Sequence, residues 1–173
     1  VLKVDKHRTF PKYASKTFEK WYKKNVAAFQ NSFPRHVSMF HGCYVNYNYP
    51  QLGKDLVSVM NALGYGVHLL ENEKCCGTAL ISNGMIDQAK RNAANNIESM
   101  RKSVYERQMP VISTSSSCTF TMRDEYPHLL GVKNEDVRDY IELATRFIYK
   151  LIDQDKVKLV FKKGYKAKVA YHT

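Results

Sequence analysis

Short apolar runs alternate with longer amphipathic stretches along the middle of the chain. Apolar runs that end at glycine or polar residues are typical of buried strands, and they occur at 37–40, 67–70 and 111–113. Between these runs, apolar side chains recur every three or four residues over 50–63 and 85–105. That spacing predicts two amphipathic helices that separate three strands.

The second half of the chain continues the alternation. Asn134 can cap a helix over 134–151, and alternating residues over 166–171 predict a last strand. Strands that alternate with helices favour a parallel sheet with right-handed crossovers. We therefore expect an α/β fold, a Rossmann-like parallel sheet with flanking helices. No G-x-G-x-x-G motif follows the first strand, so the pattern does not support a dinucleotide site.

A basic amphipathic helical segment precedes this pattern. Its apolar side chains share one helical face, and they are Phe18, Trp21, Tyr22, Val26 and Phe29. Most of its lysines lie off that face, and they are Lys16, Lys20, Lys23 and Lys24. The apolar face packs either on the domain or on a neighbouring protein, or it contacts a membrane surface.

The net charge of +11 is concentrated at the two ends of the chain. Residues 1–24 hold eight basic and two acidic side chains, and residues 150–173 hold seven and two. These ends account for the whole excess, so the middle of the chain is neutral. A nucleic-acid binder more often carries a basic stripe on its folded domain. We therefore expect no nucleic-acid partner.

Composition narrows the class of protein further. A chain of 173 residues with 44% hydrophobic residues fits one folded domain, or one and part of another. No window approaches the roughly 18 apolar residues of a transmembrane helix, and the basic start is not followed by an apolar signal core. Four cysteines, two of them adjacent, do not resemble a secreted disulfide scaffold, which favours a reducing intracellular compartment.

The cysteines follow the predicted strands. Cys43 comes after the first strand, Cys75 and Cys76 after the second, and Cys118 after the third. Carboxyl ends of parallel strands share one edge of a sheet, where open α/β folds build ligand sites. We therefore expect the four thiols to converge. Converging thiolates repel each other unless a cation neutralises them, and zinc and iron–sulfur clusters are bound in this way.

The spacing leaves several kinds of thiol chemistry open. Neither a zinc-ribbon pattern nor a ferredoxin run is present, and adjacent cysteines suit the bridging of different irons better than a single tetrahedral ion. Buried cysteines acting as small hydrophobes are one alternative. A thiol–disulfide enzyme that uses Cys75 and Cys76 is another, disfavoured by the strain of a vicinal disulfide. Four histidines could act as ligands but also fit as strand or turn residues: His41, His68, His128 and His172.

Three short motifs resemble those of cysteine-rich CCG domains. They are His41-Gly-Cys43, Lys74-Cys-Cys-Gly77 and Ser113-Thr-Ser-Ser-Ser-Cys118. Heterodisulfide reductases and the iron–sulfur subunits of glycolate oxidases share this domain. Two longer stretches, HGCYVNYNYPQLGKDL (41–56) and RDEYPHLLGV (123–132), look more specifically like the iron–sulfur subunits of anaerobic glycerol-3-phosphate dehydrogenases.

The resemblance implies an iron–sulfur cluster on Cys43, Cys75, Cys76 and Cys118. Ser115 stands where the family motif has one more cysteine, so a simpler cluster, zinc or an empty site are alternatives. The implied function is that of an electron-transfer subunit of a flavin-dependent sn-glycerol-3-phosphate:quinone dehydrogenase. A docking scaffold with zinc or no cluster, or a CCG subunit of another respiratory oxidoreductase, are the alternative functions.

The resemblance also implies partners and a domain layout. Electrons would pass from FAD on a partner dehydrogenase subunit to menaquinone, with the chain bound peripherally at the cytoplasmic face of the bacterial inner membrane. Residues 1–34 would form the basic amphipathic segment, 35–164 a first CCG domain, and 165–173 the start of a second, truncated repeat. The last assignment rests on the likeness of Ala170-Tyr-His172 to Met39-Phe-His41.

Overall fold

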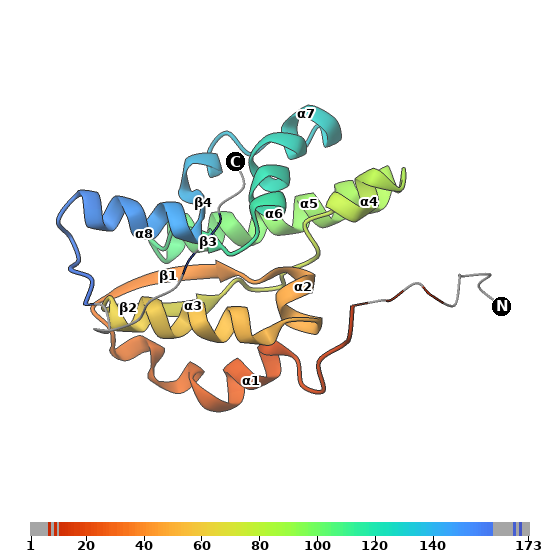
Figure 1. Ribbon diagram of the computed structural model, residues 1–173. Helices are drawn as coiled ribbons and strands as arrows, with labels where there is room; N and C mark the ends of the chain where they lie inside the picture. The colour runs from red at the N-terminus through yellow and green to blue at the C-terminus, as the bar shows by residue number, and fades with distance from the viewer. Residues whose placement is uncertain (1–6, 8, 10, 161–167, 169, 171–173) are drawn as a thin grey trace.

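The computed structural model describes residues 7, 9, 11–160, 168 and 170. Within this part of the chain, four strands form a sheet in which all neighbours are parallel (Figure 1). In the order β2-β1-β3-β4 across the sheet, they are β2 (Tyr65–Leu69), β1 (Arg35–Phe40), β3 (Val111–Ser113) and β4 (Ile141–Leu143). Helices flank the sheet, so the predicted α/β fold class is confirmed.

Helices connect and cover the strands. The longer ones are α1 (Phe18–Asn25), α3 (Pro50–Ala62), α5 (Ile86–Arg101) and α8 (Ala144–Asp153). The shorter ones are α2 (Gly42–Tyr47), α4 (Thr78–Ser82), α6 (Ser116–Phe120) and α7 (Tyr126–Leu130). Four further short helical segments of the described chain are not α-helical. The 3₁₀ helices are η1 (Ala27–Ser32) and η4 (Arg138–Tyr140), and the π-helical segments are η2 (Lys102–Glu106) and η3 (Thr121–Glu125). Among the described residues, no helix is long and apolar enough to cross a membrane.

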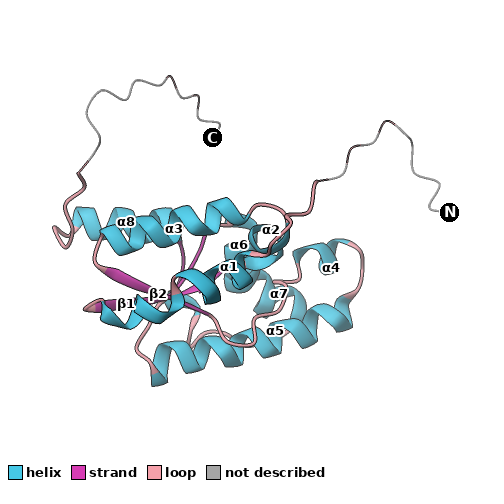
Figure 2. Cartoon of the chain, turned by 90° about the horizontal axis from the view of Figure 1, so that it is seen from below, coloured by secondary structure: helices cyan, strands magenta, loops and turns pink. Residues whose placement is uncertain are grey.

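The two faces of the sheet carry separate hydrophobic layers. Successive side chains of a strand point to opposite faces. Val37 and Met39 accordingly pack with the buried sides of α1, α3 and α8, whereas Phe40 packs with α5 and α7. Figure 2 shows α3 and α8 on one side of the strands and α5 on the other. The alternation along β1 therefore fixes which helices cover each face.

Helix α1 packs on the domain through its apolar face. Phe18 and Tyr22 are buried in the same layer as α3, with exposed fractions of 0% and 5%. The Tyr22 hydroxyl also donates a hydrogen bond to the carbonyl oxygen of Val67 at 2.5 Å. The lysines of this segment stay exposed. Of the three interpretations of this face, the structure shows packing on the domain.

The predicted helix over 134–151 is wrong in its first half. Residues 138–140 form a 3₁₀ turn, and β4 follows at 141–143 before α8 begins at Ala144. Ile141 is fully buried opposite Val111 in the sheet, so tertiary pairing overrides an apolar spacing that also suits a helix. Asn134 forms no helix cap with its side chain, because its amide donates to the carbonyl oxygens of Met122 and Arg123 at 2.7 and 3.0 Å.

The other predicted elements differ in their ends. The helix predicted over 85–105 begins at Ile86, and its last turn is the π-helical η2. The predicted last strand over 166–171 lies outside the described residues except for Lys168 and Ala170, which belong to no regular element.

Candidate functional site

The three loops that carry the cysteines meet at the carboxyl edge of the sheet. Cys43 lies in the first turn of α2 after β1, the Cys75–Cys76 pair lies between β2 and α4, and Cys118 lies in α6 after β3. Strand β1 lies between β2 and β3, so the loops after these strands are neighbours. Figure 1 shows α2 and α4 at the end of the sheet toward which the arrow of β1 points. Gly77 has a φ of 100°, a left-handed conformation that favours glycine directly after the cysteine pair.

The four thiols contact one another in a row. The Sγ atoms of Cys76 and Cys118 are 3.2 Å apart. Cys75 lies beside Cys43 on one side and Cys76 on the other, close enough for each to lower its pKa. Cys43 is exposed, Cys76 is buried, and the other two are intermediate. The structure therefore brings together all four cysteines that the sequence singled out.

Interactions within the row shift the pKa values of its thiols in opposite directions. The hydrogen bonds from Cys43 and Cys76 lower the pKa of Cys75 to about 2. The hydrogen bond from Cys76 lowers the pKa of Cys118 to about 7. Correspondingly, the pKa values of the donors Cys43 and Cys76 are raised, mainly by those same hydrogen bonds. These shifts favour the thiolate form at Cys75 and Cys118, and thiolates suit a cationic centre.

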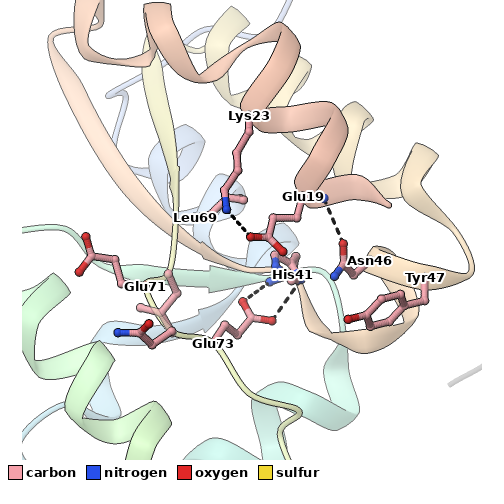
Figure 3. Close-up of a pocket in the computed structure, with 10 residues that line it drawn as sticks. Glu19, Lys23, His41, Asn46, Tyr47, Leu69, Glu71 and Glu73 are labelled. Atoms are coloured by element: carbon pink, nitrogen blue, oxygen red, sulfur yellow. Dashed lines mark hydrogen bonds and ion pairs between the residues drawn. The ribbon is translucent and has the colours of Figure 1, made fainter. Parts of the chain in front are cut away.

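Glu73 joins two of the cysteine loops. Its carboxyl group accepts the backbone N–H of His41 at 3.0 Å and that of Gly42 at 2.8 Å. These N–H groups open α2, just before Cys43, whereas Glu73 itself lies two residues before Cys75. Figure 3 shows the Glu73 side chain reaching across to His41. Its side chain is only 6% exposed, so this link is shielded from water.

Burial favours an uncharged state for Glu73 and His41. Desolvation raises the pKa of Glu73 to about 8, against the opposing effect of its two backbone hydrogen bonds. Desolvation also lowers the pKa of His41. The His41 Nδ1 atom lies 3.1 Å from Glu73 Oε1. Because both shifts favour the uncharged form, this contact is a pair of neutral groups rather than a salt bridge, and the hydrogen-bond partner of His41 Nδ1 is the carbonyl oxygen of Gly42 at 3.0 Å.

Asn96 supports the cysteine pair from the other layer. Its side-chain oxygen accepts the backbone N–H of Lys74 at 2.8 Å, and its amide donates to the carbonyl oxygen of the same residue at 3.0 Å. The amide also lies 3.1 Å from the Tyr126 hydroxyl. Asn96 is fully buried in α5. This side chain therefore anchors the peptide that precedes Cys75 to a long helix.

Hydroxyl groups surround the buried end of the thiol row. Cys76 Sγ lies 3.2 Å from Thr78 Oγ1, which in turn lies 2.7 Å from Thr121 Oγ1. Ser115 caps α6, because its Oγ accepts the backbone N–H of Cys118 at 3.2 Å. These groups can donate hydrogen bonds to sulfur, which stabilises thiolates and tunes iron–sulfur centres.

A cavity of about 270 Å³ lies beside the thiols. Its lining includes Cys43, Cys118, Thr114 and Ser115. Among the described residues, Thr114 Oγ1 is one of the buried side-chain atoms without a hydrogen-bond partner. Thiolates, hydroxyl donors and free space together fit a bulky inorganic cluster that takes sulfur ligands. The four cysteines are the residues that could hold it.

The arrangement differs from that of a single metal ion. A tetrahedral zinc site with Zn–S bonds of about 2.3 Å places each sulfur roughly 3.8 Å from all three others. Here the Sγ atoms of Cys76 and Cys118 are 3.2 Å apart, closer together than in such a site. Among the described residues, no group of three or more His, Cys, Asp and Glu side chains is arranged to hold a metal ion.

The histidines lie apart from the thiol row or have other partners. His68 Nε2 lies 3.1 Å from His36 Nδ1, between β2 and β1. His128 is exposed on α7, and His172 lies outside the described residues. His41 forms the pair with Glu73 described above.

The sequence patterns predict neither Glu73 nor Asn96 as a residue of the site, although the position of Asn96 indicates burial. Asn96 falls on the same helical face as the buried residues Ala89, Ala93 and Met100, where a polar residue is unusual. Such a residue predicts a buried hydrogen-bond partner. Glu73 lies in the loop that carries the cysteine pair, but nothing in the sequence indicates that its carboxyl group reaches the start of α2.

Comparison with known proteins gives consistent matches. A family model described as cysteine-rich domain (CCG) matches residues 37–123. An anaerobic glycerol-3-phosphate dehydrogenase subunit of Escherichia coli K12 is 52% identical over 173 residues, which is 100% of this chain and 43% of that protein. No solved structure matches the chain significantly.

More distant relatives share most of the chain. A dihydromethanophenazine:CoB–CoM heterodisulfide reductase subunit of Methanosarcina mazei is 31% identical over 140 residues, covering 79% of this chain and 32% of its own length. Lactate utilization protein A of Bacillus velezensis is 32% identical over 143 residues, covering 79% of this chain and 56% of its own length. The chain therefore spans about half the length, or less, of these relatives.

Proposed function

Because the chain belongs to the CCG family of cysteine-rich domains, we propose that it holds an iron–sulfur cluster and transfers electrons within a flavin-dependent dehydrogenase. The observation that carries this proposal is the row of four thiols formed by Cys43, Cys75, Cys76 and Cys118. These residues are the proposed ligands. A bound cluster would accept and release single electrons.

The proposed enzyme is an anaerobic sn-glycerol-3-phosphate:quinone dehydrogenase. Support comes from the 52% identity to a subunit of an anaerobic glycerol-3-phosphate dehydrogenase over all 173 residues. In this proposal the substrate is oxidised at FAD on a partner dehydrogenase subunit, and the electrons pass through this chain toward menaquinone. The residues around the thiols have supporting roles: Glu73 and Asn96 fix the loops, Ser115 accepts the backbone N–H of Cys118, and the Thr78 hydroxyl lies within hydrogen-bond distance of Cys76 Sγ.

We propose peripheral association with the cytoplasmic face of the bacterial inner membrane, because a quinone is dissolved in the lipid. The exposed lysines of the segment before β1 support contact with an anionic surface. The proposed domain layout has the basic segment at 1–34, a CCG domain at 35–164 and the start of a second repeat at 165–173.

Metal analysis and a cysteine variant of the assembled enzyme test this function. Enzyme purified anaerobically should contain iron and acid-labile sulfide on this subunit. Cys76→Ser should lower both and slow electron transfer to quinone, while glycerol-3-phosphate oxidation with an artificial acceptor at the flavin should persist. Ser117→Ala, an exposed change in α6 near Cys118, is the matched control and should leave all these measurements unchanged.

Two results would reject the electron-transfer role. Zinc without iron in the wild-type subunit would indicate a structural scaffold. Loss of both activities in Cys76→Ser would show that the site supports folding or assembly rather than electron transfer.

A further inference from the structure

Four lysines surround a tryptophan on the solvent-facing side of α1 and the neighbouring part of α3. The cavity there has a volume of about 520 Å³. Its lining includes Trp21 and the side chains of Lys16, Lys20, Lys24 and Lys54. Trp21 is the only tryptophan among the 173 residues. None of these residues lines the cavity beside Cys43 and Cys118, so the two sites are separate.

Packing holds the floor of this cavity in place. The Trp21 ring stacks on the ring of Phe18 with a centroid distance of 5.9 Å. Phe18 is fully buried in the core, which fixes the position of the indole. The Lys54 Nζ atom lies 5.3 Å from the centroid of the Trp21 ring, a cation–π contact that links α3 to α1. The cavity is therefore built mainly from two packed helices, with Ser15 and Lys16 in the bend just before α1.

The charges around the cavity are unbalanced. No carboxylate is among its lining residues. Among the described residues, none of its four lysines takes part in an ion pair. Lys23 on the same helix differs, because it pairs with Glu19 at 2.5 Å and turns toward another cavity (Figure 3). Ammonium groups gathered around one cavity repel each other, and an anion between them would relieve that repulsion.

We infer that this cavity binds a phosphate group, presented by the headgroup of an anionic phospholipid. Lysine ammonium groups are compact donors that suit phosphate oxygens. Tryptophan is enriched at the interface between membrane and water, where its ring lies at headgroup level. Because the apolar face of α1 is buried in the domain, the contact is electrostatic and does not require insertion of the helix. This inference rests on the proposed membrane association and names the surface that provides it.

Fluorescence of Trp21 tests the inference on the 173-residue chain. Vesicles containing brominated phosphatidylglycerol should quench Trp21, whereas brominated phosphatidylcholine vesicles should not. Lys20→Gln/Lys54→Gln should weaken vesicle binding roughly 30-fold, because each lysine near an anionic surface contributes a factor of about five. Lys23→Gln/Lys90→Gln removes the same charge outside the cavity and should weaken binding by less than about threefold. Inorganic phosphate should compete with the vesicles only weakly.

Several results would overturn the inference. Anionic vesicles that leave Trp21 unquenched would show that no lipid contact occurs there. Equal weakening by the two double variants would show a diffuse effect of net charge rather than a site. Saturable binding of inorganic phosphate that excludes vesicles would assign the cavity to a free phosphate compound instead of a lipid.

The electron-transfer proposal is checked on the same samples. Iron and sulfide content should be the same in both double variants, because none of the substituted lysines lines the cavity beside Cys43 and Cys118. Wild-type protein that binds vesicles but lacks iron would reject the electron-transfer role alone. Intact iron without vesicle binding would reject this inference alone.

Discussion

The carboxyl group of Glu73 accepts the backbone N–H of Gly42 at 2.8 Å. Together with the hydrogen bond from the His41 N–H at 3.0 Å, it connects the loop of Cys75 and Cys76 to the helix that carries Cys43. Without these two hydrogen bonds, the first backbone donors of α2 would be buried and unpaired, because the start of this helix has no side-chain cap of its own. Glu73 is thus both a helix cap and a tether between cysteine loops.

Replacing Glu73 by glutamine should loosen this tether. The amide keeps one acceptor oxygen but turns an N–H₂ group toward one of the two backbone donors, so one donor loses its partner. An unsatisfied buried group costs about 1–3 kcal/mol, and we expect the unfolding free energy of Glu73→Gln to fall by that amount. Urea unfolding measures the loss. Iron content per chain should fall as well, because Cys43 is held less firmly.

Glu71→Gln is the matched control for this change. Glu71 lies on the same loop, but its partner Arg107 is partly exposed. Exposed pairs contribute about 0–1 kcal/mol, so we expect little change in stability or iron content. If Glu73→Gln and Glu71→Gln behave alike, the tether has no special role in positioning the thiols.

The His36–His68 pair predicts a pH dependence of stability. Burial, with His36 and Arg107 nearby, lowers the pKa of His68 below its ordinary value of 6.5. At His68 the unfolded chain therefore binds a proton more readily than the folded chain. The contribution of the neutral His68 to the stability of the folded chain is fully present above pH 6.5 and is lost as the pH falls toward the folded pKa. His68 should accordingly lower the unfolding free energy on acidification from about pH 7.5 to about pH 5.5, whereas Glu73, whose pKa is raised to about 8, acts in the opposite direction, so the comparison with a variant lacking His68 isolates the histidine.

His68→Gln should lack the loss of unfolding free energy that His68 contributes at acidic pH. His41 with its lowered pKa and Glu73 with its raised pKa are present in both proteins, so the difference between the two profiles is assigned to His68. His128→Gln on the exposed side of α7 is the control, and its profile should match that of the wild type. A profile of His68→Gln as steep as that of the wild type would assign the pH dependence to other groups.

Much of the fold is predictable because its physical signals are local. The amphipathic spacing of α3 and α5 and the apolar runs of β1, β2 and β3 are visible in the sequence. Strand β4 is not visible in the sequence. It has only three residues, and the apolar residues before and after it recur at a helical spacing, so no alternation of apolar and polar positions marks it. Its formation depends on the partner strand β3, which is 30 residues away in sequence at the Val111–Ile141 pair.

The candidate site is predictable only in outline. Parallel topology alone brings Cys43, Cys75 and Cys118 to one edge of the sheet. The hydrogen bonds of Glu73 span 31 and 32 residues and depend on how two loops are packed, which no local pattern encodes. The order in which the four thiols contact one another also depends on how the loops are packed.

Gly53→Ala tests whether α1 is an integral part of this domain. An added Cβ would lie 2.7 Å from Phe18 Cδ2 and 2.8 Å from Val45 Cγ1, both in buried side chains. Alanine is better than glycine inside a helix by about 1 kcal/mol, which favours the variant. Overpacking of a filled core costs about 1–3 kcal/mol, which opposes it. Because Phe18 has no free space into which to move, we expect the overpacking to prevail and the unfolding free energy to fall by up to about 2 kcal/mol.

Fluorescence separates a displaced α1 from a general loss of stability. Trp21 stacks on Phe18, so movement of Phe18 should change the emission of Trp21 in folded Gly53→Ala. Ser58→Ala places alanine on the exposed side of the same helix and should stabilise the chain by a few tenths of a kcal/mol without changing the emission. A Gly53→Ala variant as stable as Ser58→Ala, with wild-type emission, would mean that α1 can shift to make room for the added methyl group without a loss of unfolding free energy. In that case its docking on α3 would be loose, and the lysine cavity between them would lack a fixed floor.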